Sequence, residues 1–531
     1  MRPDVSVTST GPARDRLPRR ALLRALGLGA AGALVAACAP AAPPTPTPAP
    51  KPTEAPKPAA TTAPATAPTA TSAPAATATS APKPTAAPTA APSPTAAAKP
   101  AVSAGTRTVP FYTTENDPDT LDFYKRTIDA FKKMKPDVEV KVTVYQDENQ
   151  LQYLTTAFQT GTDLGIFAAK APWIVQWAKV GYLLPLDSMI KAIGEDDFLP
   201  GLRIVVDGKD YAMPFQSNAS ALWCRKDLFD KAGLKLPTTY DEFLAAAKAL
   251  NKEGIAGIAT GVGAVPELTQ QYFTPYIYQS GWDYFDREGN LTFDKPEVLD
   301  AVKRFVEILK QAPKSFANVT YPDIINAYVA GKAAMGTFPG RLGVNTAKKA
   351  PQIADVTTVI ATPAGPVSTG KALFGGTEHY VSYAKTKNPE DTTAFLQFLT
   401  TGERELDFAM TVPGHLLPPL QSVRAKIKDY KSDFMAKYGS WVTTLSDLVP
   451  YSSSPALAMG SMNNKQFKRI SNVCPWGSKI WGSPPIDGTM FQEILLKGVD
   501  PEQAWKDASA KLKKAADDWK KENPDWKPSA G

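Results

Sequence analysis

A change of composition near residue 105 constrains the fold more than any other feature of the sequence. Between residues 39 and 100, 18 positions are proline, and residues 1–105 contain no Phe, Tyr or Trp. A stretch of Pro, Ala and Thr cannot bury enough apolar surface to offset its chain entropy, so we expect it to stay unfolded. The folded part must then lie in residues 106–531. That length favours two lobes or two domains over one compact core.

The net charge of +7 also belongs to the front of the chain. Residues 1–38 have a net charge of +4, residues 39–105 have +3, and residues 106–531 are formally neutral. A basic protein can suggest nucleic acid or an anionic membrane as its partner. Because the excess charge lies before the expected fold, the charge of the folded part gives no support to nucleic-acid binding.

The first 38 residues have the features of an export signal. The pair Arg19-Arg20 leads into the apolar run 25–37, which is long enough for a signal sequence and too short for a stable membrane-spanning helix. The run ends in small residues followed by Cys38 and so resembles a bacterial lipobox, which implies lipidation of Cys38 and attachment to a membrane. An uncleaved signal anchor is the alternative, and both Sec and twin-arginine export fit the paired arginines. We therefore expect a lipoprotein signal peptide over 1–37 and a lipidated, disordered tether over 38–105.

From residue 106 onward, strand and helix patterns alternate. Residues 108–112 read as a short strand, apolar residues recur at helical spacing over 121–134, and valines alternate with polar residues over 138–144. A long helix begins at Asp500-Pro501, a cap residue followed by a first-turn proline. This β-α-β alternation predicts mostly parallel sheets covered by helices, and the length of the region favours two such sheets.

Several segments resemble one known family. They match, in order along 106–531, motifs of the extracellular solute-binding proteins of family 1, namely 181–187 (GYLLPLD), 207–215 (DGKDYAMPF), 221–234 (ALWCRKDLFDKAGL), 237–243 (PTTYDEF), 331–336 (GKAAMG) and 395–399 (FLQFL). Each motif is weak by itself, and their order makes the set specific.

The resemblance implies an α/β fold of two lobes, like that of the periplasmic binding proteins (type II style), which closes on its ligand by hinge bending. Three hinge crossovers are expected near 218–220, 375–377 and 418–420. Lobe 1 would then comprise 106–219 plus 377–419, and lobe 2 would comprise 220–376 plus 420–531.

Candidate ligand-binding residues follow from the loops beyond strand ends, where such sheets bind ligands, and from the flat rings and polar groups that sugars require. They are Tyr112, Glu115, Trp173, Gln216, Asn218, Tyr278, Trp282, Phe338, Arg341, Gly376 and Glu378. Each has a structural alternative. The aromatic residues could be ordinary core residues, Glu115 could cap a helix, Arg341 could form an ion pair between the lobes, and Gly376 could serve only the hinge.

Signs of catalysis are scarce in this sequence. His379 and His415 are the only histidines, which excludes a His-rich metal site, and no GxSxG, HExxH or phosphate-loop pattern occurs. We therefore expect no enzymatic activity, no metal and no cofactor.

Together these features predict a lipid-anchored substrate-binding protein of an ABC importer on the extracytoplasmic face of the membrane. It would be a monomer that captures a carbohydrate or related polyol and delivers it to permease subunits. Arg341 leaves an anionic ligand open. The alternatives are a tethered carbohydrate-active enzyme and a ligand-sensing lipoprotein.

Two cysteines remain beside Cys38. Cys224 and Cys474 could form one disulfide outside the cytoplasm or stay as two buried thiols, and the sequence leaves both open.

Overall fold

A computed structural model describes residues 105–146, 149–367 and 371–528. The expected signal peptide, the lipidation of Cys38 and nearly all of the expected tether lie outside the described residues.

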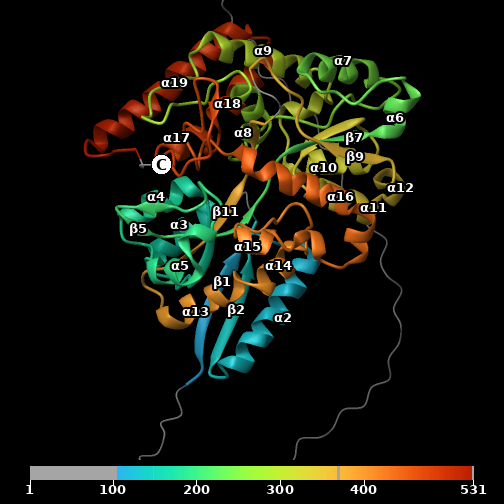
Figure 1. The fold of residues 1–531 in the computed structure, drawn as a ribbon. Helices are drawn as coiled ribbons and strands as arrows, with labels where there is room; N and C mark the ends of the chain where they lie inside the picture. The colour runs from blue at the N-terminus through green and yellow to red at the C-terminus, as the bar shows by residue number, and fades with distance from the viewer. Residues whose placement is uncertain (1–104, 147–148, 368–370, 529–531) are drawn as a thin grey trace, which may run out of the picture. The chain divides into compact units, whose positions relative to one another are not determined.

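The first lobe is built around a five-stranded sheet with the strand order β2-β1-β3-β11-β6 (Figure 1). β1 runs parallel to β2 and β3, and β11 runs antiparallel to β3 and β6. The elements of this lobe are β1 Arg107–Thr113, α2 Pro118–Met134, β2 Val138–Val144, α3 Gln150–Thr160, β3 Ile166–Ala169, α4 Ala171–Lys179, α5 Asp187–Ile193, the hairpin β4 Val205–Val206 and β5 Lys209–Asp210, β6 Met213–Ser217, β11 Thr377–Ser382, α13 Pro389–Leu399, α14 Glu403–Ala409 and α15 Gln421–Arg424.

The strand and helix predicted for the start of the fold are confirmed. Val109 and Phe111 of β1 are fully buried, and β1 pairs with β2 along its whole length. β2 is an edge strand, so only Val138 and Val140 of its valines are buried while Val142 stays exposed. The blue α2 packs against the orange α14, which brings two segments distant in sequence side by side (Figure 1).

The second lobe is built around the three-stranded sheet β8-β7-β9. Its elements are β7 Ala221–Arg225, α6 Lys226–Lys231, α7 Tyr240–Leu250, α8 Leu268–Tyr278, α9 Pro296–Leu309, α10 Tyr321–Val329, β8 Met335–Phe338, α11 Arg341–Lys349, α12 Pro351–Ala354, β9 Thr357–Ile360, the pair β10 Leu373–Phe374 and β12 Ser452–Ser453, α16 Asp433–Leu448, the hairpin β13 Met462–Asn463 and β14 Gln466–Phe467, α17 Gly477–Trp481, α18 Ile486–Lys497 and α19 Pro501–Glu522. Short 3₁₀ turns occur at Glu195–Asp197, Lys314–Ala317, Ile427–Asp429 and Val449–Tyr451.

The expectation of mostly parallel sheets holds for the first lobe and is wrong for this second sheet. β7 is antiparallel to both of its neighbours, with Ala221 opposite Phe338 of β8 and Leu222 opposite Ile360 of β9. β7 enters the lobe directly from the first sheet, whereas β8 and β9 run in the opposite direction. The alternation of strands and helices in the sequence carries no information on that change of direction.

The two sheets are joined by chain segments that lie side by side. Residues 218–220 connect β6 to β7, and residues 375–376 connect β10 to β11. Asn218 donates its backbone N–H to the carbonyl of Gly376 at 3.0 Å, and Ser220 donates to Phe374 at 2.9 Å. A Cβ atom on Gly375 would stand 2.2 Å from the Ser452 hydroxyl oxygen, so this close approach requires glycine.

The third expected crossover lies near 418–420, where the chain is still paired with the first lobe. Leu417 bridges to Ser217 and Leu420 bridges to Phe198. The chain reaches the second sheet later, through α16, which packs against β9. The division into 106–219 plus 377–419 and 220–376 plus 420–531 stays a proposal.

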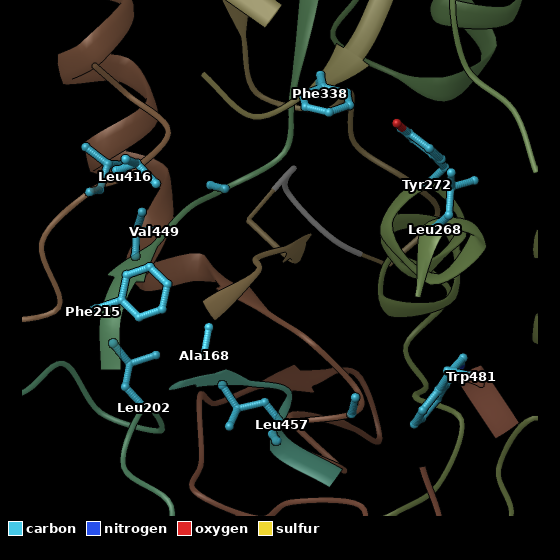
Figure 2. Close-up of a cluster of buried hydrophobic side chains, with 14 of the residues drawn as sticks. Ala168, Leu202, Phe215, Leu268, Tyr272, Phe338, Leu416, Val449, Leu457 and Trp481 are labelled. Atoms are coloured by element: carbon cyan, nitrogen blue, oxygen red, sulfur yellow. The ribbon is translucent and has the colours of Figure 1, made fainter. Parts of the chain in front are cut away.

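Two aromatic residues of the second lobe meet where the strands end. Phe338, the last residue of β8, faces Tyr272 of α8 with ring centroids 6.5 Å apart (Figure 2). All eleven residues of α8 are buried, so this helix has no solvent-facing side.

Cys224 and Cys474 are both free thiols, and both are fully buried. Of the two possibilities left open by the sequence, the structure has the pair of buried thiols and no disulfide between them. Burial raises the pKa of both thiols, which keeps them protonated and unreactive.

We predict that neither cysteine reacts with an alkylating reagent in the native protein and that both react fully after unfolding. Peptide mapping by mass spectrometry checks this result, because it separates these two sites from Cys38. Labelling of the unfolded chain should be the same with and without a reducing agent. A requirement for the reductant would show that a disulfide forms.

Two buried carboxyl groups surround Tyr284 in the second lobe. The Asp283 carboxylate accepts hydrogen bonds from the backbone N–H groups of Tyr284 at 2.7 Å and Gly460 at 2.9 Å, and Asp487 accepts one from the Tyr284 hydroxyl at 2.7 Å. Burial raises the pKa of Asp283 to about 7 and the pKa of Asp487 to about 6. The folded protein therefore holds protons that an unfolded chain has already released above its ordinary carboxyl pKa of about 3.9.

This difference predicts that the free energy of unfolding falls as the pH rises from about 4 to about 7. Replacing Asp283 by Asn should remove one of the protons that the folded state binds in excess of the unfolded state. The slope of the free energy of unfolding against pH should then be smaller by about 1.4 kcal/mol per pH unit in that window. Denaturant unfolding at a series of pH values measures the slope. Asp241→Asn, which removes a carboxyl that is 92% exposed, is the matched control. An equal slope in the wild type and the Asp283 variant would contradict the prediction.

Candidate functional site

A cavity of about 440 Å³ lies where the ends of the first-lobe strands meet helices of the second lobe. The first lobe contributes residues just beyond β1, β2, β3 and β6 and at the start of β11, as expected for an α/β sheet that binds ligands beyond its strand ends. The second lobe contributes residues of α8, α10 and α11 and the segment 454–457. The wall of the cavity thus belongs to both lobes.

An ion pair between the lobes forms one side of the cavity. Arg341 is the first residue of α11, and Glu115 and Asp117 lie in the loop after β1. The Arg341 Nη2 atom lies 2.8 Å from the Glu115 carboxylate, and Nη1 forms a second ion pair with Asp117. Burial of the guanidinium opposes its charge, but the attraction of Glu115 and then Asp117 outweighs that cost and raises the pKa of Arg341. Lys348, farther along α11, pairs with Asp119 of α2 at 2.7 Å.

The approach of α11 to the first lobe depends on a glycine. A Cβ atom on Gly340, the residue before α11, would stand 2.2 Å from the carbonyl carbon of Gly414. No other residue fits there without moving the backbone of one of the two segments. The glycine therefore allows the Arg341 ion pairs to form.

A second group of charges lies around Lys170, which directly precedes α4. Its Nζ atom is 3.9 Å from a carboxylate oxygen of Glu378 in β11 and 4.0 Å from one of Glu267, the residue before α8. The Thr114 hydroxyl donates a hydrogen bond to the other oxygen of Glu378 at 3.3 Å. Glu267 belongs to the second lobe, so these charges also connect the two lobes.

Amide side chains add neutral hydrogen-bonding groups to the wall. Gln216 and Asn218 are buried at the end of β6, with the Asn218 Nδ2 group 3.3 Å from the Gln216 Oε1 atom. Asn218 Oδ1 accepts the backbone N–H of Gly376 at 3.0 Å, which fixes its orientation. Gln271 of α8 lines the cavity as well.

Three rings lie together at the cavity, Phe338 and Tyr321 from the second lobe and His415 from the first. Phe338 is stacked against His415 with centroids 6.5 Å apart and meets Tyr321 edge-on at 6.1 Å. Burial and then the nearby charge of Arg341 lower the pKa of His415 well below its ordinary value, so its imidazole is neutral at physiological pH. The cavity therefore combines paired charges and neutral polar groups with an apolar ring surface.

Seven of the residues proposed from the sequence line this cavity. They are Glu115, Gln216, Asn218, Phe338, Arg341, Gly376 and Glu378. Of the two roles considered for Arg341, the structure has the ion pair between the lobes, and the same side chain also lines the cavity.

Four proposed aromatic residues do not line it. Tyr112 lies against Tyr145 and Tyr153, and Trp173 lies 5.8 Å from Trp177. Tyr278 is fully buried in a separate apolar cluster with Ala372 and Met462, and Trp282 is half-buried with the Lys295 ammonium over its ring at 5.5 Å. Each of these rings is used in packing.

Several cavity residues were not proposed from the sequence. Lys170, Asn345, Lys349, Gln271, Tyr321 and His415 all line the wall. Arg341, Asn345 and Lys349 recur every four residues, so the helical period could have placed them on one face of α11. Gln271 has no comparable signal, because α8 is buried on every side and shows no amphipathic pattern.

The described residues offer no site for a bound metal ion. They contain no group of three or more His, Cys, Asp or Glu side chains arranged to hold a metal ion. No helix in the described ranges is long and apolar enough to span a membrane.

Comparison with known proteins identifies the family. The sequence profile described as "Bacterial extracellular solute-binding protein" matches residues 117–403. A Brucella abortus protein named as a binding protein is 24% identical over 409 residues, which cover 76% of this chain and 91% of that protein.

Two solved structures share the fold. An ABC transporter solute-binding protein from Agrobacterium vitis with bound D-mannitol superposes with a TM-score of 0.62 and 22% identity, covering 78% of this chain and 99% of that one. One from Thermotoga lettingae bound with α-D-tagatose gives a TM-score of 0.64 and 22% identity, covering 77% and 100%. These likenesses confirm the two-lobe α/β fold expected from the sequence.

The profile match covers more than half of the chain and includes the segments whose motifs suggested the family. The chain belongs to the bacterial extracellular solute-binding protein family, whose members bind solutes and are not enzymes.

Proposed function

We propose that this protein is the lipid-anchored substrate-binding component of an ABC importer. It holds a carbohydrate or related polyol in the cavity between its lobes and delivers it to the permease subunits as a monomer. The observation that carries the proposal is the cavity itself, because both lobes build its wall and its charges are paired across the lobes.

The size and chemistry of the cavity support a small polyhydroxyl ligand. Its volume of about 440 Å³ lies in the range of roughly 300–1,000 Å³ that is usual for small-molecule sites. Gln216, Asn218 and the carboxylates supply donors and acceptors for hydroxyl groups. Phe338 supplies a flat apolar face for C–H groups. The seven predicted residues that line the cavity are the proposed ligand contacts.

The charges argue against an anionic ligand. In the sequence, Arg341 leaves open an anionic ligand such as an acidic sugar or a glycerophosphodiester. Its guanidinium is already shared between Glu115 and Asp117, and an anion would have to displace a carboxylate from this pair. Removing one partner of a buried ion pair leaves an uncompensated charge, which is costly.

Binding and closure would be coupled. Two chain segments at 218–220 and 375–376 connect the lobes, and the side chains of Arg341 and Lys170 form ion pairs that join them around the cavity. A hinge motion at the connecting segments would open the cavity and separate these charges. A ligand that contacts both lobes favours the closed state.

Membrane attachment would use Cys38 and the tether behind it. An acylated Cys38 with more than one chain gives stable anchoring. A tether over 38–105 reaches about 200 Å when extended as polyproline II and roughly 45 Å as a relaxed coil. The folded part could then move between solute capture and the permease on the extracytoplasmic face.

The known relatives agree with this ligand class. D-mannitol and α-D-tagatose are the ligands of the two solved structures described above, a linear polyol and a ketose.

Calorimetric titration of the full chain with monosaccharides, hexitols and disaccharides tests the proposal, and we expect at least one to bind. Replacing Gln216 by Ala should then weaken binding about fivefold, because one hydrogen bond contributes roughly 1 kcal/mol and about 1.4 kcal/mol corresponds to a factor of ten. Chemical conversion of the ligand during the titration, or no binding across the panel, would contradict the proposed function.

Matched variants control for indirect effects on that titration. Gln492→Ala removes an amide that bonds to the carbonyl of Ala317 outside the cavity and should leave affinity unchanged. Tyr112→Ala and Trp282→Ala should also leave it unchanged, since neither ring lines the cavity. A loss of affinity in the two ring variants but not in Gln216→Ala would place the site elsewhere.

The anchor has a separate test. Cys38→Ala should move the protein from the membrane fraction to the soluble fraction and abolish incorporation of a radiolabelled fatty acid. Ligand affinity should not change, because every cavity-lining residue in the described ranges lies after residue 113. Continued membrane attachment of the variant would favour an uncleaved signal anchor.

A further inference from the structure

Three residues of the cavity wall have a buried polar atom without a hydrogen-bond partner among the described residues. The atoms are the Gln271 Nε2 group, the Thr377 hydroxyl oxygen and the His415 Nδ1 atom. Gln271 as a whole is more than nine-tenths buried. A buried polar atom that stays unpaired costs free energy, so nearly all such atoms in proteins are paired. Because the three residues line one cavity, a bound ligand can supply the missing partners.

The three residues belong to both lobes. Gln271 lies in α8 of the second lobe, whereas Thr377 begins β11 and His415 follows α14 in the first lobe. The ring of Phe338 is near two of these positions. It stacks on His415, and it faces Tyr272, the residue after Gln271 (Figure 2). A ligand that bonds to all three polar atoms therefore bridges the lobes.

The three atoms differ in the hydrogen bonds that they can form. The Gln271 Nε2 group only donates, and the Thr377 hydroxyl both donates and accepts. His415 is neutral, because burial and then the charge of Arg341 lower its pKa, so its Nδ1 atom donates in one tautomer and accepts in the other.

This combination indicates which ligand group the wall recognises. An ammonium group only donates and cannot pair with the Gln271 amide. A carboxylate only accepts and cannot pair with the His415 Nδ1 atom when the proton is on Nε2. A hydroxyl group donates and accepts, so it suits all three atoms in either tautomer.

We infer that Gln271, Thr377 and His415 form a subsite for the hydroxyl groups of a neutral polyol, with contacts from both lobes. The inference rests on the proposed function and adds to it residues that select hydroxyl groups over charged groups. Since Gln271 belongs to one lobe and the other two residues to the other, the ligand forms all of these hydrogen bonds only when the lobes are together. Binding at this subsite therefore favours the closed state.

Variants of similar side-chain volume test the subsite in the full chain. Thr377→Val, Gln271→Met and His415→Leu each remove one unpartnered atom. Affinity is measured by calorimetry for the panel member that the wild type binds most tightly, with D-glucose, D-mannitol and maltose tried first. Each variant should bind it about fivefold more weakly, because one hydrogen bond to the ligand is lost. His415→Asn keeps a polar atom close to the position of Nδ1 and should bind more tightly than His415→Leu.

Thermal unfolding without ligand separates this role from a structural one. The midpoint should not fall in Thr377→Val or Gln271→Met, because the removed atom has no partner within the protein to lose. Thr292→Val gives the opposite pattern. The Thr292 hydroxyl is buried outside the cavity and donates to the Asp283 carbonyl at 2.7 Å, so this variant should lower the midpoint and leave the affinity unchanged.

Thr274→Val is the matched control for position. The Thr274 hydroxyl is fully buried and has no partner among the described residues, as in Thr377, but Thr274 does not line the cavity. This variant should leave both the affinity and the midpoint of unfolding unchanged or raise the midpoint. An affinity loss in Thr274→Val as large as that in Thr377→Val would overturn the inference, because the loss would not depend on the cavity wall.

Ligands that lack one hydroxyl locate the contact. The monodeoxy forms of the bound sugar or alditol are titrated against the wild type and against each variant. A hydroxyl that bonds to Thr377 contributes to the affinity of the wild type but not to that of Thr377→Val, so for one deoxy form the two losses should not add. Fully additive losses for every deoxy form in all three cavity variants would contradict direct contact.

The outcomes separate this inference from the proposed function. If the wild type binds a sugar or alditol and the three cavity variants bind it equally well, the inference is wrong and the proposed function stands. If the wild type binds no member of the saccharide panel, the proposed function fails and the inference fails with it. Should one cavity variant not fold, its unfolding curve shows this and the other two carry the test.

Discussion

The cavity depends on the contact between two of the segments that connect the lobes, 218–220 and 375–376. Asn218 exchanges hydrogen bonds with Gly376, its backbone N–H meeting the Gly376 carbonyl and its side-chain oxygen meeting the Gly376 N–H. The same two residues line the cavity. The proposed hinge and the proposed ligand site therefore share residues, so a ligand bound against Asn218 or Gly376 would act directly on the segments about which the lobes would move.

Charged side chains of the cavity wall also join the two lobes. Arg341 and Lys170 cannot be buried without partners, because an isolated charge in a water-poor site is too costly. Their carboxylate partners include residues of the other lobe, so the ion pairs exist only when the lobes are together. The free-energy cost of burying an unpaired charge therefore favours the arrangement in which the two lobes are together. Gly340 is needed for the same contact between the lobes, since a side chain there would hold α11 away from Gly414.

The sequence predicts the parts of this structure that depend on local pattern. The period of β1 and α2, the start of α19 at Asp500-Pro501 and the ordered motifs are local, and they lead to the correct family and fold. Polar residues at or just beyond strand ends, such as Gln216 and Glu115, are found for the same reason. The strand directions of the second sheet are not local, and there the expectation of parallel strands fails.

The aromatic residues show why the rest of the site could not be predicted. A ring that packs in the core and a ring that faces a ligand look the same in a sequence. Tyr278 packs on Met462, almost two hundred residues later, and only that contact shows its role. The net charge of a sequence likewise does not show which charges face a ligand. Residues 106–531 are formally neutral, so their net charge gives no support to nucleic-acid binding. A formally neutral chain can still gather charged side chains around one cavity, and a ligand responds to the charges that surround it and not to their sum over the chain.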